Sequence, residues 1–194
     1  MLVEVVTLEG AHVRLEPLSS THHAGLCRVG LDPELWRWTT AVVGTPEEMR
    51  EYIESALEYQ AEGTCLPFAV VARATGLVIG STRYGNIDPA NRRLEIGWTW
   101  YGREWQRTAV NTECKYLLLR HAFEALGAIR VELKTDSLNQ RSRTAILRIG
   151  AKEEGTLRNH MITWSGRLRH TVYHSVIDTE WPEVKRTLEG KLGP

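Results

Sequence analysis

The alternation of apolar and polar residues along this chain predicts a series of short strands. Apolar Leu94, Ile96 and Trp98 occupy every second position of one stretch, which is the period of a strand with one buried face. The same pattern, bounded by turn residues, predicts strands over 7–16 around a turn at Gly10, 66–73, 77–84, 129–135, 151–157 and 171–177. The stretches 66–73 and 77–84 are expected to form a hairpin, and 159–170 to connect the last two strands.

Apolar residues at intervals of three and four predict the helices. A long helix is expected from 111 onward because such positions recur there, at Cys114, Leu117, Leu118, Ala122, Ala125 and Leu126. Thr45, Pro46 and Glu48 form a helix start, with a capping hydroxyl, a proline in the first turn and a capping-box carboxylate. Further helices are expected over 21–29, 139–149 and from Pro182 to Gly190.

This order of elements predicts an α/β (α+β) fold. It implies a mixed central sheet of about seven strands, flanked by about four helices plus a C-terminal helix. No repeat or low-complexity linker interrupts the order, so residues 1–194 are expected to form a single domain.

Composition excludes several functional classes. Lys plus Arg equals Asp plus Glu, at 24 each, so the net charge gives no reason to expect nucleic-acid binding. The three cysteines contain no CxxC pair and the seven histidines show no ligand spacing, so no metal is expected. No secretory signal and no run of roughly 20 apolar residues is present, which predicts a cytoplasmic protein without a membrane partner.

The stretch between the strand at 94 and the helix after 111 is a candidate anion site. Residues 105–110 lead into a helix start, where backbone N–H groups lack partners within the helix and the helix dipole is positive. Such a site suits a phosphate or pyrophosphate. An ordinary strand-to-helix connection has the same sequence features, and the stretch alone does not separate the two interpretations.

Several motifs in their order along the chain resemble the GNAT acetyltransferase superfamily, in particular the branch of ribosomal-protein N-terminal acetyltransferases (RimJ/RimL-like). The resemblance covers nearly all of residues 7–181. It rests on Leu8-Glu9-Gly10 with Val13-Arg14-Leu15, Leu94-Glu95-Ile96-Gly97-Trp98, Trp105-Gln106-Arg107, Gly127-Ala128-Ile129-Arg130-Val131-Glu132, Asn139-x-x-Ser142-x-x-Ala145-Ile146 and Gly150-Ala151-x-x-Glu154-Gly155. It implies a GNAT fold and an acyl-CoA-dependent N-acyltransferase.

The resemblance implies that acetyl-CoA binds along the strand and over the helix start. The residues expected to contact it are Trp98, Thr99, Trp100, Gln106, Arg107, Thr108, Ala109, Val110, Asn111, Thr112, Asn139 and Arg143. Arginine suits phosphate oxygens, so Arg107, Arg141 or Arg143 is expected to reach the CoA phosphates. The family's loop usually reads Gln/Arg-x-x-Gly-x-Gly/Ala, whereas Ala109 and Asn111 replace its glycines here. Their loss is expected to restrict φ and crowd the phosphates, although the backbone N–H donors remain.

The transfer needs a neutral amine, a polarised carbonyl and a proton for the leaving thiolate. Glu95 is the candidate base, and the alternative is a surface carboxylate paired with Arg93 or Arg130. Backbone N–H groups near 98–100 are candidates to hold the carbonyl oxygen. By resemblance, Asn139 holds the pantetheine arm and Ser142 protonates the thiolate. The alternative for both is helix capping, and Tyr173 is a second candidate acid.

The sequence does not identify the acceptor amine. A protein N-terminal α-amine is favoured, with a small-molecule amine or amino acid, or a succinyl donor, as the rival. A non-catalytic acyl-CoA-binding domain is the alternative from another class, and a homodimer is a family-level expectation. Trp36, Trp38 and Trp164 are candidates to line the acceptor pocket. The acidic helix over 47–62 is predicted to be a solvated face, or alternatively to attract a cationic substrate.

Overall fold

The computed structural model describes residues 1–193. Its strands are β1 (Leu8–Glu9), β2 (Val13–Pro17), β3 (Leu66–Ala72), β4 (Val78–Asp88), β5 (Arg93–Tyr101), β6 (Arg130–Asp136), β7 (Lys152–Ile162) and β8 (Leu168–Ile177). Its α-helices are α1 (His23–Gly30), α2 (Pro46–Ala61), α3 (Ala109–Arg120), α4 (Gln140–Arg148) and α5 (Trp181–Leu192). Short 3-10 helices lie at Ser20–His22, Pro33–Trp36 and Arg103–Trp105, and a π-helical turn at His121–Ala125 follows α3.

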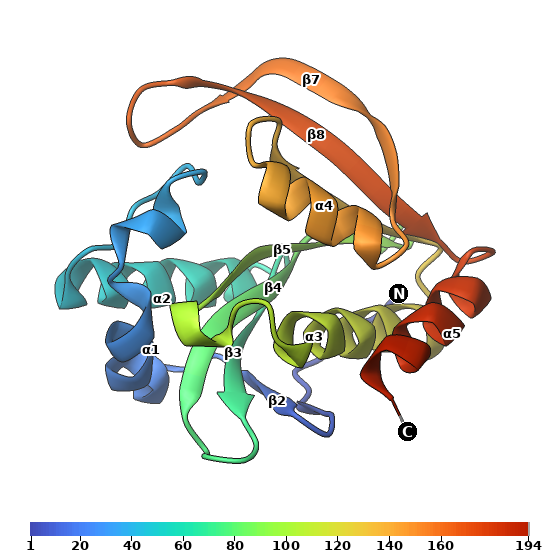
Figure 1. Ribbon diagram of the computed structural model, residues 1–194, viewed down its shortest axis with the longest axis horizontal. Helices are drawn as coiled ribbons and strands as arrows, with labels where there is room; N and C mark the ends of the chain where they lie inside the picture. The colour runs from blue at the N-terminus through green and yellow to red at the C-terminus, as the bar shows by residue number, and fades with distance from the viewer. Residues whose placement is uncertain (194) are drawn as a thin grey trace.

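The strands form one eight-stranded mixed sheet in the order β1-β2-β3-β4-β5-β6-β8-β7 (Figure 1). Neighbouring strands are antiparallel except for β5 and β6, which are parallel. The fold class and the four helices plus a C-terminal helix confirm the prediction from sequence. The sheet has one strand more than expected, because the turn at Gly10 divides residues 7–17 into two paired strands.

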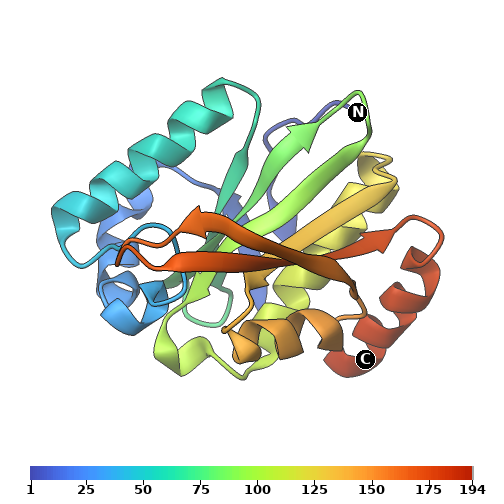
Figure 2. The same ribbon diagram turned by 90° about the horizontal axis from the view of Figure 1, so that it is seen from above.

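The two faces of the sheet are covered by different helices. On one face α3 and α5 enclose the larger core, which contains the fully buried side chains Phe68, Tyr84, Leu94, Leu118 and Leu133. On the other face α1 and α2 enclose a smaller core around Trp36, Met49, Ile53 and Trp100. The turned view in Figure 2 shows α1 and α2 on one side of the sheet and α3 and α5 on the other.

The hairpin of β7 and β8 differs from the prediction. Strands were expected to end at 157 and to resume at 171, whereas β7 continues to Ile162 and β8 begins at Leu168. Register shifts interrupt the pairing between Glu153 and Gly155 and again between Leu157 and Met161, so the two-residue alternation is lost along β7. The hairpin arches over α4 (Figure 1), and at its tip Trp164 Nε1 donates to the Trp36 carbonyl oxygen at 2.9 Å.

Candidate active site

A bulge in β5 opens the sheet beside β6. Arg83 pairs with Gly97 and Ser81 with Trp100, so Trp98 and Thr99 together oppose the single residue Thr82. Trp98 has a φ of 49°, in the left-handed region, and its ring is 46% exposed. The parallel pairing of β5 with β6 extends only as far as Glu95 and Glu132. Beyond that point the two strands are no longer paired, and we call this unpaired part of the sheet, between β5 and β6, the opening.

The helix start predicted as an anion site is present at α3. Thr108 caps the helix: its hydroxyl accepts a hydrogen bond from the Val110 N–H at 3.3 Å and donates one to the Trp105 carbonyl at 2.8 Å. The first-turn N–H groups of α3 therefore face the strand end with few partners of their own. This arrangement suits a pyrophosphate.

The expectation that the missing glycines restrict φ is wrong, whereas the expected crowding of the phosphates stays a prediction. Ala109 and Asn111 lie in the first turn of α3 and neither has a positive φ, so no glycine is required at either position. The left-handed residue of the loop is Arg107, with a φ of 62°. The side chain of Arg107 is exposed and pairs with no acid among residues 1–193, which leaves it available to an anion.

Two arginines of α4 contact the loop before α3 and the first turn of that helix. Arg141 Nη2 donates to Gln106 Oε1, and Gln106 Nε2 donates to the Tyr101 carbonyl at 2.8 Å. Arg148 Nη2 donates to the hydroxyl of the buried Thr112 at 3.2 Å. These contacts hold Gln106 and Thr112 at the start of α3, where both were expected to meet the cofactor.

The other predicted cofactor residues of α4 have structural partners as well. Asn139 Oδ1 accepts from the Ser142 N–H at 3.1 Å, so Asn139 caps α4 as the alternative interpretation predicted. Its side-chain nitrogen and the Ser142 hydroxyl make no hydrogen bond within residues 1–193, so both are free to meet a ligand. Arg143 pairs with Glu153 of β7 at 3.1 Å. Of these two arginines, Arg141 therefore contacts the loop before α3, whereas Arg143 contacts β7.

Glu95 lies where the paired part of β5 ends. It is 7% exposed, its carboxylate accepts from Asn86 Nδ2 at 2.6 Å, and it pairs with Lys134 Nζ at 2.9 Å. The sequence alternative, pairing with Arg93 or Arg130, is wrong, because those two arginines bind Glu132 instead. Burial acts to lower the pKa of Lys134, but Glu95 and its other neighbours hold that pKa above its usual value. The lysine is therefore charged and keeps Glu95 oriented.

Lys115, a buried lysine of α3, is a candidate site residue that the sequence did not single out. Lys115 Nζ donates to the Thr99 hydroxyl at 2.7 Å, and that oxygen also lies 2.7 Å from the Thr82 hydroxyl. No carboxylate of residues 1–193 lies within 4.0 Å of it, and burial lowers the pKa of Lys115 to about 8. The signal in the sequence was a lysine on a helix whose other positions are mostly apolar, directly after Cys114.

Further groups of this region come from β6, from β8 and from the turn before β8. Tyr173 lies opposite Lys134, whose Nζ is 4.5 Å from the centre of the tyrosine ring. Asp136, fully buried, pairs with Arg167, and the Arg167 guanidinium lies over the Trp38 ring. The three tryptophans that were expected to line the acceptor pocket lie in two different places. Trp36 is buried in the smaller core, whereas Trp38 and Trp164 lie where the hairpin tip meets residues 33–40.

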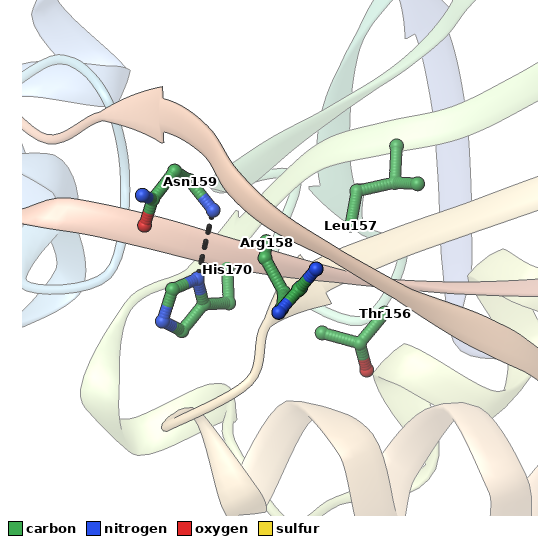
Figure 3. Close-up of a pocket in the computed structure, with 5 residues that line it drawn as sticks. All are labelled: Thr156, Leu157, Arg158, Asn159 and His170. Carbon is green, nitrogen blue, oxygen red and sulfur yellow. Dashed lines mark hydrogen bonds between the residues drawn. The ribbon is translucent and has the colours of Figure 1, made fainter.

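A hollow on the surface of the protein lies outside this site. Figure 3 shows a shallow hollow on the β7–β8 hairpin, lined by Thr156, Leu157, Arg158, Asn159 and His170, where the Asn159 N–H donates to His170 Nδ1 at 2.8 Å. It shares no residue with the opening between β5 and β6. Among residues 1–193, no group of three or more His, Cys, Asp or Glu side chains is arranged to hold a metal ion. None of the described helices is long and apolar enough to span a membrane.

Known proteins share this architecture and much of its sequence. A GCN5-related N-acetyltransferase from Brucella melitensis is 34% identical, with a TM-score of 0.92 over 99% of this chain and 87% of that chain. The crystal structure of a protein from T. thermophilus named "putative acetyltransferase" is 36% identical, with a TM-score of 0.90 over the whole of both chains.

A protein of Bacillus subtilis (strain 168) named "Putative ribosomal N-acetyltransferase YdaF" is 33% identical over 110 residues, which are 57% of this chain and 59% of that protein. The match thus spans less than two thirds of that relative's length. The family model of the acetyltransferase (GNAT) domain matches residues 12–152, from β2 to the start of β7, and so includes the bulge of β5, the capped start of α3 and α4. The chain therefore belongs to the GNAT acetyltransferase family.

Proposed function

We propose that the protein transfers an acetyl group from acetyl-CoA to a primary amine, with a protein N-terminal α-amine as the acceptor. The observation that carries the proposal is the position of Glu95. Its carboxylate lies where β5 and β6 separate and is fixed by Asn86 and Lys134. A proton acceptor held at the edge of the opening is what amine acylation requires.

The residues around the opening fit acyl-CoA. The first-turn N–H groups of α3, with Arg107 and Arg141, supply donors and positive charge for the pyrophosphate. Trp98 and Thr99 lie in the part of β5 that is not paired with β6, so the backbone there is a candidate contact for the pantetheine arm, and the free amide nitrogen of Asn139 at the start of α4 is a second candidate donor. When bound, acetyl-CoA supplies a thioester whose carbonyl carbon is the electrophile.

The proton transfers can be assigned to residues of this chain. An α-amine has a pKa of ~7.7–8.0, so a sizeable fraction of the amine is neutral at physiological pH and a weak base suffices to accept its proton during the reaction. Glu95 takes a proton from the attacking nitrogen, directly or through water, as the C–N bond forms. Ser142 would give its hydroxyl proton to the sulfur as the C–S bond breaks and would regain a proton from solvent. Backbone N–H groups of the β5 bulge would stabilise the negative charge on the carbonyl oxygen, and Lys115 positions Thr99 in that bulge.

The name of the Bacillus subtilis relative supports a ribosomal-protein N-terminus as the acceptor. Two contacts favour a second candidate, a small-molecule amine or an amino acid. The tip of the β7–β8 hairpin is hydrogen-bonded to the segment 33–40 through Trp164 and Trp36, and Arg169, on the face that carries Glu95, contacts the Trp38 carbonyl of the same segment. A segment joined to this face in two places favours a small acceptor. The cytoplasmic location and the homodimer stay predictions.

The first experiment is a thermal-shift titration with acetyl-CoA, succinyl-CoA and free CoA. A ligand present at a hundred times its Kd should stabilise the fold by about 2.7 kcal/mol, which is readily seen as a higher midpoint. A shift with acetyl-CoA justifies assays of CoA release with N-terminal peptides and with small amines. No shift with any of the three would overturn the proposal, because the start of α3 would then not bind the cofactor.

A further inference from the structure

The face of the sheet that carries Glu95 presents a row of charged side chains across four neighbouring strands. Residues opposite one another in a sheet share a face, and so do residues two apart along a strand. The register therefore places Arg83 of β4, Glu95 of β5, Lys134 of β6 and Arg169 of β8 on this face. We call these four residues the acceptor face, because the cofactor loop at α3 lies on the other side of the sheet.

Every acid near this row already has a cationic partner. Lys134 lies 2.9 Å from Glu95 and 3.2 Å from Glu132. Glu132 also binds Arg93 and Arg130, and Asp136 binds Arg167. The cations of the region therefore outnumber the acids, and two guanidinium groups are left over.

Arg169 is the first of these two. Its Nε donates to the Thr171 hydroxyl at 3.2 Å and its Nη1 to the Trp38 carbonyl at 3.4 Å. Within residues 1–193, Nη2 makes no hydrogen bond and no carboxylate lies within 4.0 Å of the guanidinium. The side chain is only partly exposed, yet it remains unpaired with Glu95 and Asp136 on the same face. These neutral partners fix the guanidinium and leave Nη2 free to donate.

Arg83 is the second. It is 3% exposed, its Nε has no hydrogen-bond partner, and its Nη2 contacts only the Tyr52 carbonyl, at 3.4 Å. The Tyr52 ring lies 4.4 Å from the guanidinium carbon and the Trp98 ring 5.8 Å from it. Aromatic faces stabilise a cation only in part, and a buried charge normally has a charged or fully hydrogen-bonded partner.

We infer that the acceptor face binds a carboxylate next to the reacting amine, with Arg169 as its main partner and Arg83 adding positive charge on the other side of Glu95. A fixed guanidinium with a free Nη2 matches a carboxylate in charge and can donate a charge-assisted hydrogen bond to it. The carboxylate belongs either to the acceptor, as the α-carboxylate or an acidic side chain near the amine, or to the acyl chain, as in a succinyl group. The inference rests on the proposed function and names the substrate class of that site.

The test compares substrates that differ only in the carboxylate. For the acceptor, Ala-Asp-NH2 is compared with Ala-Asn-NH2, both with acetyl-CoA. For the acyl chain, succinyl-CoA is compared with acetyl-CoA, both with Ala-Asn-NH2. A hydrogen-bonded ion pair gives about ten- to hundredfold discrimination, so one of the two carboxylate substrates should have a KM lower by that factor. Arg169→Gln should abolish the preference. The control Arg158→Gln removes an exposed, unpaired arginine of β7 and should leave it unchanged.

A binding measurement separates this inference from the proposed function. The CoA-bound protein is titrated with the products Ac-Ala-Asp-NH2, Ac-Ala-Asn-NH2 and succinyl-Ala-Asn-NH2, and the thermal shift is recorded. Tighter binding of one carboxylate product, lost in Arg169→Gln, supports the inference even if no amine is turned over. In that case the proposed function alone would be wrong. Equal binding and equal KM within both pairs, or a preference that survives Arg169→Gln, would overturn the inference.

Discussion

The two sides of the opening between β5 and β6 are built in different ways. The cofactor side is local: Gln106, Arg107, Thr108 and the first turn of α3 follow one another in the chain, and their donors are mainly backbone N–H groups. The acceptor face is assembled from four strands, and its chemistry depends on which charged side chains find a partner. A backbone site tolerates side-chain changes, whereas a site of paired charges is sensitive to each one. Under the proposed function, the cofactor side should therefore tolerate side-chain changes, whereas single substitutions on the acceptor face should matter.

The sharpest test of this contrast is Glu95→Gln. Removing a general base typically costs about 10²- to 10⁴-fold in kcat, while the affinity for acetyl-CoA should stay unchanged because α3 provides its donors. Glu132→Gln is the matched control, since it removes the other carboxylate bound to Lys134. Steady-state kinetics combined with a thermal-shift titration measures both effects. If Glu95→Gln lowers kcat less than threefold, Glu95 serves only as an ion-pair partner.

Lys115→Met should raise stability and lower turnover. Burial lowers the pKa of Lys115 from 10.5 to about 8. At a pH where the lysine is charged in both states, this difference destabilises the folded state by roughly 3 kcal/mol. Below pH 8 the full cost is present. Between pH 8 and 10.5 the unfolded state binds more protons than the folded state, so wild-type stability rises with pH and the advantage of the variant shrinks.

Urea unfolding at pH 7 and at pH 9.5 measures the change, and kcat at pH 7.5 tests whether Lys115 positions Thr99. The exposed Lys152→Met serves as the control and should change stability by less than about 1 kcal/mol. A Lys115→Met advantage that is equal at both pH values would show that burial does not lower the pKa of this lysine.

A smaller effect is expected on the cofactor side. Ala109→Gly, which restores a glycine of the usual family loop, should destabilise the protein by about 0.5–1 kcal/mol and leave the Kd for acetyl-CoA unchanged, because position 109 is helical. Arg107→Gly, at the left-handed position, should relieve backbone strain and weaken CoA binding through the loss of a cation. Denaturant unfolding and CoA titration of both variants check the pair. Tighter CoA binding by Ala109→Gly would show that the alanine does crowd the phosphates.

No change is expected from the acidic face of α2. Glu54 and Glu58 are exposed and belong to no ion pair among residues 1–193. The double variant Glu54→Gln, Glu58→Gln should leave the KM of a polyamine and of Ala-Asn-NH2 within twofold at low salt. A rise in KM restricted to the polyamine would revive the interpretation that these acids attract cationic substrates, and would contradict a cleft that prefers carboxylates.

The sequence by itself determined most of the elements and the capped helix start that is proposed to bind the cofactor. Alternation, capping residues and turn signals act over a few neighbouring positions, and they located the helices, most strands and the capped start of α3. The edge strand β7 was predicted too short because its bulges break the alternation and because it is exposed along its length, so no buried face marks it in the sequence.

Only the tertiary structure decided which charges are paired. The sequence pattern pointed to Glu95 but predicted the wrong partners for it. Its partner, Lys134, lies on β6, 39 positions further along the chain. The same holds for Lys115, whose partner is on β5, and for Arg83 and Arg169, whose unpaired state depends on all the side chains around them. Secondary structure follows from local backbone preferences, whereas the pKa and the availability of a charged group depend on burial and on neighbours that the fold alone brings together.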